Sequence, residues 1–292
     1  DFSWTDNSAG DCTFAIYRST DGVTYSSVGT TVAGDTTYTA TGLTAGNLYY
    51  FYVKGVKSGN ESDPTNIYDT RFKITVDTTK AGSANNTFVL GTSYNGTFNY
   101  YVDWGDGGVE DHVTVNTPQT KVYAAPGTYQ IKIRGVFPWL YMPNGDYAKV
   151  ASIDNFGNIK WGILSRNAFK SCSNMVGTFI DIPNLSAAQD LSGFFEGCSS
   201  FNSPIINWSI PAATKISKFI VGAAKFNSPI SFINAGEVLD ASYLLYNNAI
   251  FNQNVNFNFP KLTNCSRFLS GSPLFNSLVV LTTGLVTDMT YM

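Results

Sequence analysis

Residues 194–202 read Phe194-Phe195-Glu196-Gly197-Cys198-Ser199-Ser200-Phe201-Asn202, and the last two of them recur at a fixed interval. Phe-Asn pairs occupy Phe201-Asn202, Phe226-Asn227, Phe251-Asn252 and Phe275-Asn276, at steps of 25, 25 and 24 residues. Self-similarity at such a period indicates a repeat architecture, in which one unit cannot bury its apolar side without its neighbours. We therefore expect residues 138–292 to wind into a stack of similar units that is C-terminally incomplete.

Each unit carries two patterns around its Phe. Upstream, Leu191, Phe194, Phe195 and Cys198 follow the i, i+3, i+4, i+7 spacing of one face of a helix. The equivalent sets are Ile216, Phe219, Ile220 and Ala223; Ala241, Leu244, Leu245 and Asn248; and Cys265, Phe268, Leu269 and Ser272. Downstream, short apolar runs at 204–210, 229–233, 254–259 and 278–281 predict strands. The sequence thus predicts a short strand and a short helix per unit.

The first 67 residues show short alternating runs separated by turns such as Ser19-Thr20-Asp21-Gly22, which is typical of an antiparallel sandwich. The tract Leu43-Thr44-Ala45-Gly46-Asn47-Leu48-Tyr49, followed by a strand over 50–56, matches a tyrosine corner. Together with Trp4, this segment resembles a fibronectin type III domain that lacks its first strand.

Residues 68–137 form a second β-rich segment, with strands expected at 71–77, 87–90, 98–104, 120–123 and 128–134. The tract Asp103-Trp104-Gly105-Asp106-Gly107 resembles the polycystic-kidney-disease (PKD) type of immunoglobulin-like sandwich, which implies a structural turn held by Asp side chains. The alternative is a Ca²⁺ site on Asp103, Asp106, Glu110 and Asp111. We favour the structural turn, because the spacing of an EF-hand loop is absent.

The repeats resemble a known family. Residues Ala168-Phe169-Lys170-Ser171-Cys172-Ser173-Asn174, the stretch 194–202 and Val286-Thr287-Asp288-Met289-Thr290-Tyr291-Met292 look like BspA-like leucine-rich repeats of the mycoplasma surface lipoprotein type. The expected fold class is therefore mainly β. It comprises two immunoglobulin-like sandwiches, 1–67 and 68–137, followed by a leucine-rich-repeat-like solenoid over 138–292. Both ends of the sequence look cut.

Composition narrows the possible functions. Only 13% of residues are charged and the formal net charge is −3, with no Lys/Arg cluster to neutralise phosphates, so nucleic acid and membrane surfaces are not expected partners. No run of about 18 apolar residues is present, so we expect no membrane insertion in this segment. The cysteines show no zinc spacing, and no metal or cofactor is expected.

Alignment of the units gives roles to two columns. Cys172 and Cys198 share a column with Ala223, Asn248 and Ser272, and Cys265 aligns with Leu191, so we expect packing positions there. Cys12 is expected within a strand. The Asn column at 202, 227, 252 and 276 is open to a carbohydrate-binding interpretation. We favour an inward ladder that satisfies turn backbone groups.

Catalysis has few candidate residues. His112 is the only histidine, and it lies beside Glu110 and Asp111 without a recognisable nucleophile motif. A glycosidase needs only two carboxylates, and the repeats offer Glu196, Glu237 and Asp240, but none recurs in a setting that indicates a cleft. We expect a non-catalytic protein.

The remaining function is recognition through a surface. A row of outward strand positions, Ile206, Ser231, Asn256 and Val280, is the candidate contact surface; the opposite face, or no contact role at all, is an equal alternative. The resemblance implies an extracellular adhesin at a bacterial cell surface or on a phage virion, binding a cell-surface protein or glycan. The alternatives are a structural virion component, such as a tail fibre or capsid decoration in a larger assembly, and an accessory region of a carbohydrate-active enzyme.

Overall fold

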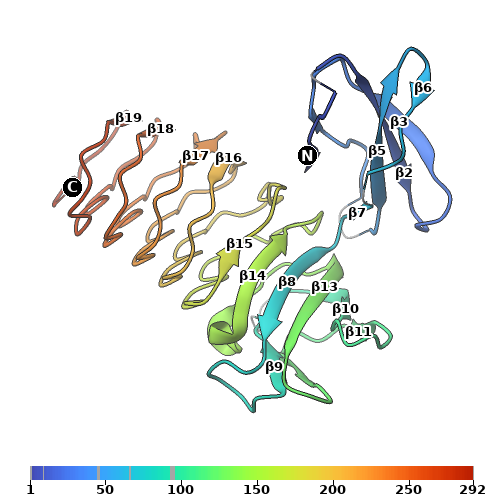
Figure 1. Cartoon of the computed structure of the whole chain (residues 1–292). Coiled ribbons are helices and arrows are strands. Elements are labelled where there is room, and N and C mark those ends of the chain that lie inside the picture. The colour runs from blue at the N-terminus through green and yellow to red at the C-terminus, as the bar shows by residue number, and fades with distance from the viewer. Residues whose placement is uncertain (1, 9, 45–46, 66, 93–95, 292) are drawn as a thin grey trace.

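The protein is mainly β. The computed structural model describes residues 2–8, 10–44, 47–65, 67–92 and 96–291. Figure 1 shows three parts in chain order, which we name the N-terminal part (residues 2–69), the central part (residues 70–163) and the C-terminal stack (residues 164–291). Within the described ranges no helix is long and apolar enough to cross a membrane.

The N-terminal part consists of two small antiparallel sheets around their own core. Its strands are β1 (Phe2–Ser3), β2 (Thr13–Ser19), β3 (Ser26–Thr30), β4 (Thr37–Tyr38), β5 (Tyr50–Lys57), β6 (Asn60–Glu61) and β7 (Tyr68–Asp69). One sheet has the order β3-β2-β5-β6 with β7 also on β5, and the other is β1-β4. The Tyr49 hydroxyl accepts a hydrogen bond from Thr44 N at 3.2 Å, which is the contact of a tyrosine corner. Cys12, expected within a strand, is buried one residue before β2.

The central part is built on one large sheet. Its elements are β8 (Phe72–Asp77), β9 (Thr87–Leu90), β10 (Asn99–Asp103), β11 (Asp111–Val113), β12 (Gln119–Val122), β13 (Thr128–Val136), β14 (Val150–Asn155) and the 3₁₀ helices η1 (Met142–Asn144) and η2 (Tyr147–Lys149). The sheet order β11-β10-β13-β8-β14-β15 ends with β15 (Val176–Gly177) of the stack. Hydrogen bonding therefore crosses the predicted boundary at residue 137 without a break, and one hydrophobic core runs from Phe72 to Phe268.

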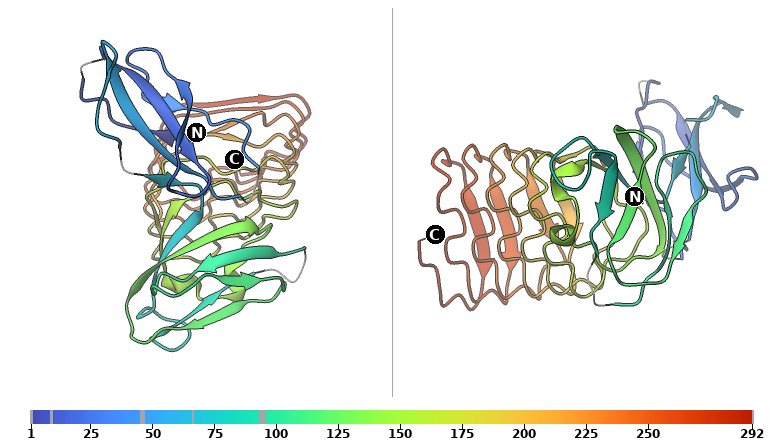
Figure 2. Two further views of the ribbon diagram at one scale, coloured as in Figure 1. Left: turned by 90° about the vertical axis from the view of Figure 1, so that its right-hand side faces the viewer. Right: turned by 90° about the horizontal axis from the view of Figure 1, so that it is seen from below.

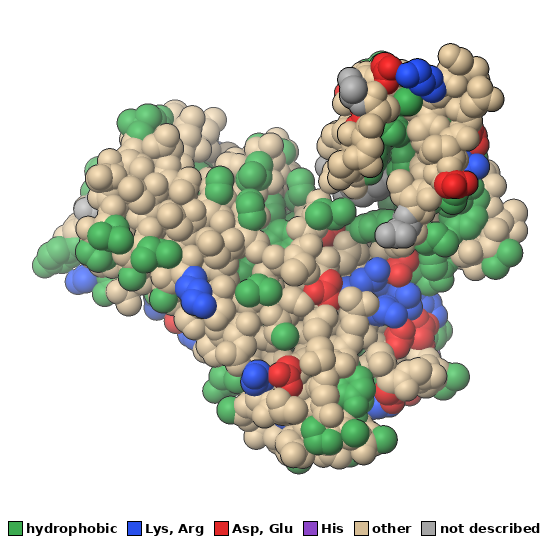
Figure 3. Space-filling view, viewed as in Figure 1, with side chains coloured by type: hydrophobic (Ala, Val, Ile, Leu, Met, Phe, Trp, Pro, Cys, Tyr) green, Lys and Arg blue, Asp and Glu red, His purple; other side chains and the backbone are tan. Residues whose placement is uncertain are grey.

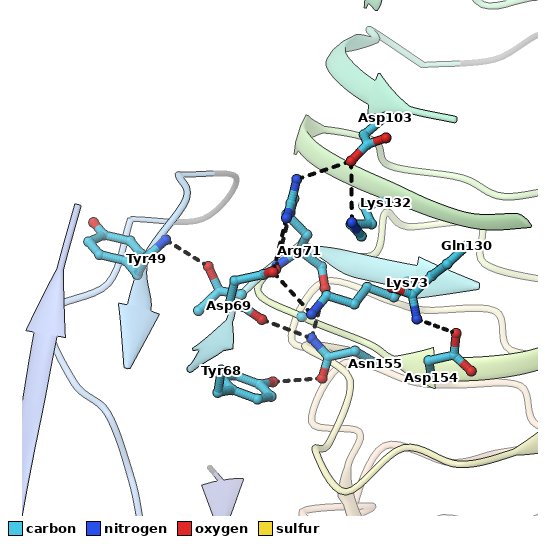
Figure 4. Close-up of polar contacts among 12 residues, drawn as sticks. Tyr49, Tyr68, Asp69, Arg71, Lys73, Asp103, Gln130, Lys132, Asp154 and Asn155 are labelled. Atoms are coloured by element: carbon cyan, nitrogen blue, oxygen red, sulfur yellow. Dashed lines mark hydrogen bonds and ion pairs between the residues drawn. The ribbon is translucent and has the colours of Figure 1, made fainter. Parts of the chain in front are cut away.

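Side chains from all three parts meet where the N-terminal part joins the rest. Tyr68 Oη donates to Asn155 Oδ1 at 2.7 Å, and it lies 3.2 Å from Asp181 Oδ2. The Asp181 carboxylate also accepts from the backbone N–H groups of Phe156 and Gly157, at 2.9 and 2.6 Å. Burial raises the pKa of Asp181, although these donors act in the opposite direction. Figure 4 shows Tyr68 and Asn155 facing each other across this junction.

The C-terminal stack is made of similar stretches that lie side by side, as the two views of Figure 2 show. Its strands after β15 are β16 (Ile205–Ser209), β17 (Ile230–Ile233), β18 (Val255–Phe259) and β19 (Val279–Thr283), paired in parallel as β16-β17 and β18-β19. Single parallel bridges link Leu164, Asp190, Lys215, Asp240, Asn264 and Asp288 in succession. We use "rung" for each stretch that begins at one of these bridge residues.

The short helix predicted in each rung is absent. The apolar residues of the predicted helical set, such as Leu191, Phe194 and Phe195, are fully buried, but the segment is a series of turns. Its backbone N–H groups alternate between two kinds of acceptor. The N–H groups of Leu191, Gly193, Phe195 and Gly197 donate to the next rung, and those of Phe194, Glu196 and Cys198 donate three residues back. A helix would satisfy these groups internally, whereas here half of them join neighbouring rungs.

Left-handed residues explain this correction. The fourth residue of each rung has φ between 54° and 65°, and the eighth between 57° and 77°. The fourth positions are Asn167, Gly193, Lys218, Tyr243, Arg267 and Tyr291, and the eighth are Ser171, Gly197, Gly222, Asn247 and Gly271. A right-handed helix cannot pass through a left-handed residue every four positions, so the apolar spacing of a helix is realised by consecutive tight turns.

Candidate binding face

The predicted contact row lies on β16–β19, whose side chains alternate between the core and solvent. Ile205, Ile230 and Val255 are buried, and Val279, near the end of the stack, is half-buried. The residues that follow them form the predicted row: Ile206 is 46% exposed, Asn256 is exposed, Val280 is 39% exposed and Ser231 is half-buried. These four side chains belong to the outward side of the strands, which we call the strand face.

Register makes the row continuous in one half of the face and offset in the other. Asn256 pairs directly with Val280, within an unbroken ladder from Val255↔Val279 to Phe259↔Thr283. Between β16 and β17 the register shifts after Ile205↔Ile230, at Asn207, whose φ is +55°. Asn207 N donates to Ser231 Oγ at 2.8 Å and fixes this irregularity. Ile206 and Ser231 are therefore not paired neighbours.

The strand face is uncharged. The residues of β15 to β19 include no Asp, Glu, Lys or Arg. Exposed groups on these strands are aliphatic, as at Ile206 and Ile233, or are amides and hydroxyls, as at Asn258 and Thr282. Figure 3 shows few charged side chains on the visible side of the stack, in contrast to the cluster of both signs below the N-terminal part. The groups that such a surface offers for contact are its shape, its apolar area and neutral hydrogen-bonding groups.

A row of aromatic rings runs along the core of the stack. Ring centroids are 6.1 Å apart for Phe201–Phe226, 5.5 Å for Phe226–Phe251 and 5.9 Å for Phe251–Phe275, with the planes within 19° of parallel. The first three rings are fully buried and Phe275 is half-buried. The predicted structural Phe column is thus one continuous stack, and it joins successive rungs through ring contacts.

The Asn column links the same rungs through hydrogen bonds. Oδ1 of Asn202 accepts from Asn227 N at 2.7 Å, and the same bond at 2.9 Å joins Asn227 to Asn252 and Asn252 to Asn276. Each of the first three side chains therefore binds the backbone of the next rung. The column does not face inward as expected, since Asn202 and Asn276 are exposed and the two between them are half-buried.

The column that contains cysteine is a hydrogen-bonding column. Three of its members donate to a carbonyl of the preceding rung: Cys198 Sγ to Phe169 O at 3.0 Å, Asn248 Nδ2 to Ile220 O at 2.7 Å and Ser272 Oγ to Leu245 O at 3.2 Å. All four cysteines are free and buried, and burial raises the pKa of Cys198 well above its usual value. Alignment of the repeat units did not predict this hydrogen-bonding role. The polar residues Asn248 and Ser272 in the column were the one feature that could have indicated it.

The four carboxylates proposed for Ca²⁺ do not converge. Asp103 Oδ1 accepts from Gly105 N at 2.9 Å and Asp106 Oδ1 from Gly108 N at 3.2 Å, the bonds of a structural turn. Asp106 also lies 2.6 Å from Lys121 Nζ, and this hydrogen bond lowers the pKa of Asp106. Glu110 pairs with Arg134 at 2.6 Å, and Asp111 Oδ2 accepts from Trp104 Nε1 at 2.7 Å. In the described part of the chain no group of three or more His, Cys, Asp and Glu is arranged to hold a metal.

The residues considered for catalysis have separate structural partners. His112 stacks on Tyr101, with ring centroids 4.5 Å apart, and its Nε2 lies 2.7 Å from Asn99 Oδ1. Glu196 pairs with Lys170 at 3.0 Å, Glu237 with Lys261 at 2.7 Å, and Asp240 Oδ1 accepts from Ser242 N at 2.9 Å. The His112 contacts lie between β10 and β11, and the others connect neighbouring rungs or close a turn, so the four residues are not brought together.

Comparison with known proteins gives one match. Residues 165–292, which cover the C-terminal stack, match the model of a family described as Mycoplasma protein of unknown function, DUF285. No curated protein and no solved structure matches the chain.

Proposed function

We propose that this chain is an extracellular, non-catalytic binding protein whose strand face engages a cell-surface protein or glycan. The observation that carries this proposal is the uncharged strand face itself, where exposed aliphatic, amide and hydroxyl groups of β16–β19 lie in adjacent rows. Charged side chains are expensive to desolvate when a partner binds, and this face has none on its strands.

The repeats fit a leucine-rich-repeat-like solenoid of the BspA-like type, in which the short helix is replaced by turns. The supporting features are the 24 to 26 residue spacing of the bridges from Leu164 to Asp288, and the Phe and Asn columns that join each rung to the next. A solenoid of this kind exposes equivalent positions as rows, so a partner meets a broad and rigid surface.

In this proposal the N-terminal and central parts serve as a spacer, and they correspond to a fibronectin type III-like and a PKD-like module. The buried contacts of Tyr68 with Asn155 and Asp181 support a stiff junction, because three parts of the chain share one hydrogen-bond network there. A stiff spacer holds the strand face at a fixed orientation relative to the N-terminal part.

The test is binding of the full chain to a panel of host-cell surfaces, purified surface proteins and neutral and charged glycans. The face variant Ile206→Lys/Val280→Lys places two charges on the strand face, and we expect it to lose the binding that the unmodified chain shows. The control variant, Val122→Lys/Val136→Lys, places the same charges at exposed aliphatic positions of the central part and should bind normally.

Equal binding by the face variant would show that contact is made elsewhere, and absence of binding by the unmodified chain across the panel would contradict a recognition role. Because the face is neutral, we also expect affinity to depend weakly on salt concentration.

A further inference from the structure

A polar pocket separate from the strand face lies between the N-terminal and central parts. Its volume is about 600 Å³. It is lined by Thr20, Asn47, Leu48, Tyr49, Tyr50, Arg71, Glu110 and Arg134. Pockets at the junction of two structural parts are common ligand sites, because both parts contribute groups that fix the ligand's orientation.

The two arginines of this pocket are held in place before any ligand arrives. Arg71 is anchored from behind by Asp69, with Nε and Nη2 at 3.2 and 3.0 Å from its carboxylate oxygens. The guanidinium of Arg134 lies 3.9 Å from the centroid of the Tyr101 ring. Figure 4 shows Arg71 between Asp69 and Asp103, with Lys132 beyond. An ordered guanidinium loses little rotamer freedom when it pairs with a planar anion.

Glu110 sits between the two arginines without using up their donors. Arg134 Nε and Nη2 both donate to Glu110 Oε2, at 2.9 and 2.6 Å, whereas Arg71 Nη1 is 3.5 Å from Oε1. A guanidinium has five N–H donors and a carboxylate about four acceptor positions. The arginines therefore keep N–H donors, and Glu110 keeps acceptor positions, that a ligand can use. The pocket therefore offers donors for an anion beside an acceptor for hydroxyl groups.

The charges around the pocket add up to a single excess positive charge. The connected ion pairs join four cations, Arg71, Lys73, Lys132 and Arg134, to three carboxylates, Asp69, Asp103 and Glu110, which leaves +1 (4 − 3). This excess stands in a chain whose formal net charge is −3. One unbalanced positive charge is complementary to a monoanion, whereas a phosphate dianion would leave one negative charge unbalanced beside Glu110.

We propose that this pocket binds an acidic sugar residue, a monosaccharide unit that carries one carboxylate. The sugar carboxylate pairs with Arg134 and with the side of Arg71 that faces away from Asp69. The sugar hydroxyls donate hydrogen bonds to Glu110 and form hydrogen bonds with Thr20 and Asn47 at the rim of the pocket. The half-buried Tyr50 supplies an apolar surface for the ring. The site is independent of the strand face, so it adds recognition of acidic glycans to whatever the stack binds.

The experiment is ligand-observed NMR or calorimetry on the full chain, with the methyl glycosides of glucuronic acid and N-acetylneuraminic acid as probes and methyl glucoside as the neutral counterpart. We expect saturable binding of at least one acidic probe at millimolar concentration, weakened by added salt, and none of the neutral one. Arg134→Gln should weaken binding by about tenfold or more, because the ligand carboxylate loses its charge-assisted hydrogen bond. Arg166→Gln, an exposed arginine of the stack, is the matched control and should bind normally.

A second variant guards against misfolding of Arg134→Gln. Thr20→Trp fills the rim from an exposed position without changing any charge, and it should also block binding. Equal binding of acidic and neutral glycosides, or unchanged affinity in Thr20→Trp, would overturn the proposal, as would no saturation by either acidic probe. None of these outcomes depends on whether the strand face binds a partner.

Discussion

The side-chain amide of Asn248 donates to the carbonyl oxygen of Ile220 at 2.7 Å, and its Oδ1 accepts from Ala223 N at 2.8 Å. Asn248 is fully buried, so both bonds are made away from water. One side chain therefore satisfies two backbone groups of the preceding rung, in the column where other rungs have cysteine, alanine or serine.

Removing that amide should destabilise the stack. Asn248→Ala leaves a buried carbonyl and a buried N–H without their partners, and each costs about 1–3 kcal/mol. Asn248→Ser retains one donor, as Ser272 does in the next rung, and should cost less. Urea denaturation gives the comparison, with the exposed Asn258→Ala as the control. A loss in Asn248→Ala no larger than in Asn258→Ala would contradict this role.

The left-handed turns are testable with two glycines that differ only in backbone conformation. Gly222 has φ +66°, and a Cβ there would meet nothing within 4 Å; Gly236 is equally open but has no positive φ. Gly222→Ala should therefore lower stability by about 1–2 kcal/mol through backbone strain alone. Gly236→Ala should be neutral or raise stability by up to about 1 kcal/mol. Equal effects of the two substitutions in thermal denaturation would argue against the turn geometry.

The phenylalanine stack should be among the most sensitive parts of the fold. Phe226 is fully buried between Phe201 and Phe251, so Phe226→Ala should cost about 3–5 kcal/mol and Phe226→Leu clearly less. The exposed Ile233→Ala on the neighbouring strand is the control, and we expect little change there. The measurement is the free energy of unfolding of each variant. A small loss of this free energy in Phe226→Ala would mean that the rings do not stabilise one another.

Asp181 should make stability depend on pH in a defined direction. Because burial raises its pKa in the folded state, the folded chain binds this proton more tightly than the unfolded chain. The contribution of Asp181 is therefore fully present below the unfolded pKa of 3.8, and it declines as the pH rises from there through the folded value, by about 1.4 kcal/mol per unit of pKa difference. Asp181→Asn should remove this slope. Parallel curves of unfolding free energy against pH for the two proteins would contradict the assignment.

Much of the architecture could be predicted because it depends on which residue types occupy particular positions in the sequence. The Phe column at 201, 226, 251 and 275 repeats at the spacing of the rungs, and the strands that were predicted lie within two residues of their expected bounds, whereas β11, β14 and β15 were not predicted. The turn at Asp103 and Asp106 could also be predicted, because Asp and Gly residues close together in the sequence are typical of a tight turn. The helix prediction failed because i, i+3, i+4, i+7 spacing is also produced by two turns joined through left-handed residues. Gly193, Gly197, Gly222 and Asn247 were the indication that such residues recur.

The parts that could not be predicted depend on contacts between distant segments. The parallel pairing of β14 with β15 joins the central part to the stack, and no local pattern marks it. The pocket between Tyr50 and Arg134 brings together residues that are 84 positions apart (134 − 50). Likewise, the strand positions Asn256 and Val280 were expected from alternation, but the offset at Asn207 arises only from pairing with β17.

The central claim is that the strand face is the recognition surface. Its most direct test is amide hydrogen exchange of the full chain, measured with and without the member of the panel that binds the unmodified chain. The account predicts slowed exchange in 255–259 and 279–283, and no change in the central strands β9 and β12. Protection confined to the N-terminal and central parts, with these two strands unchanged, would contradict it.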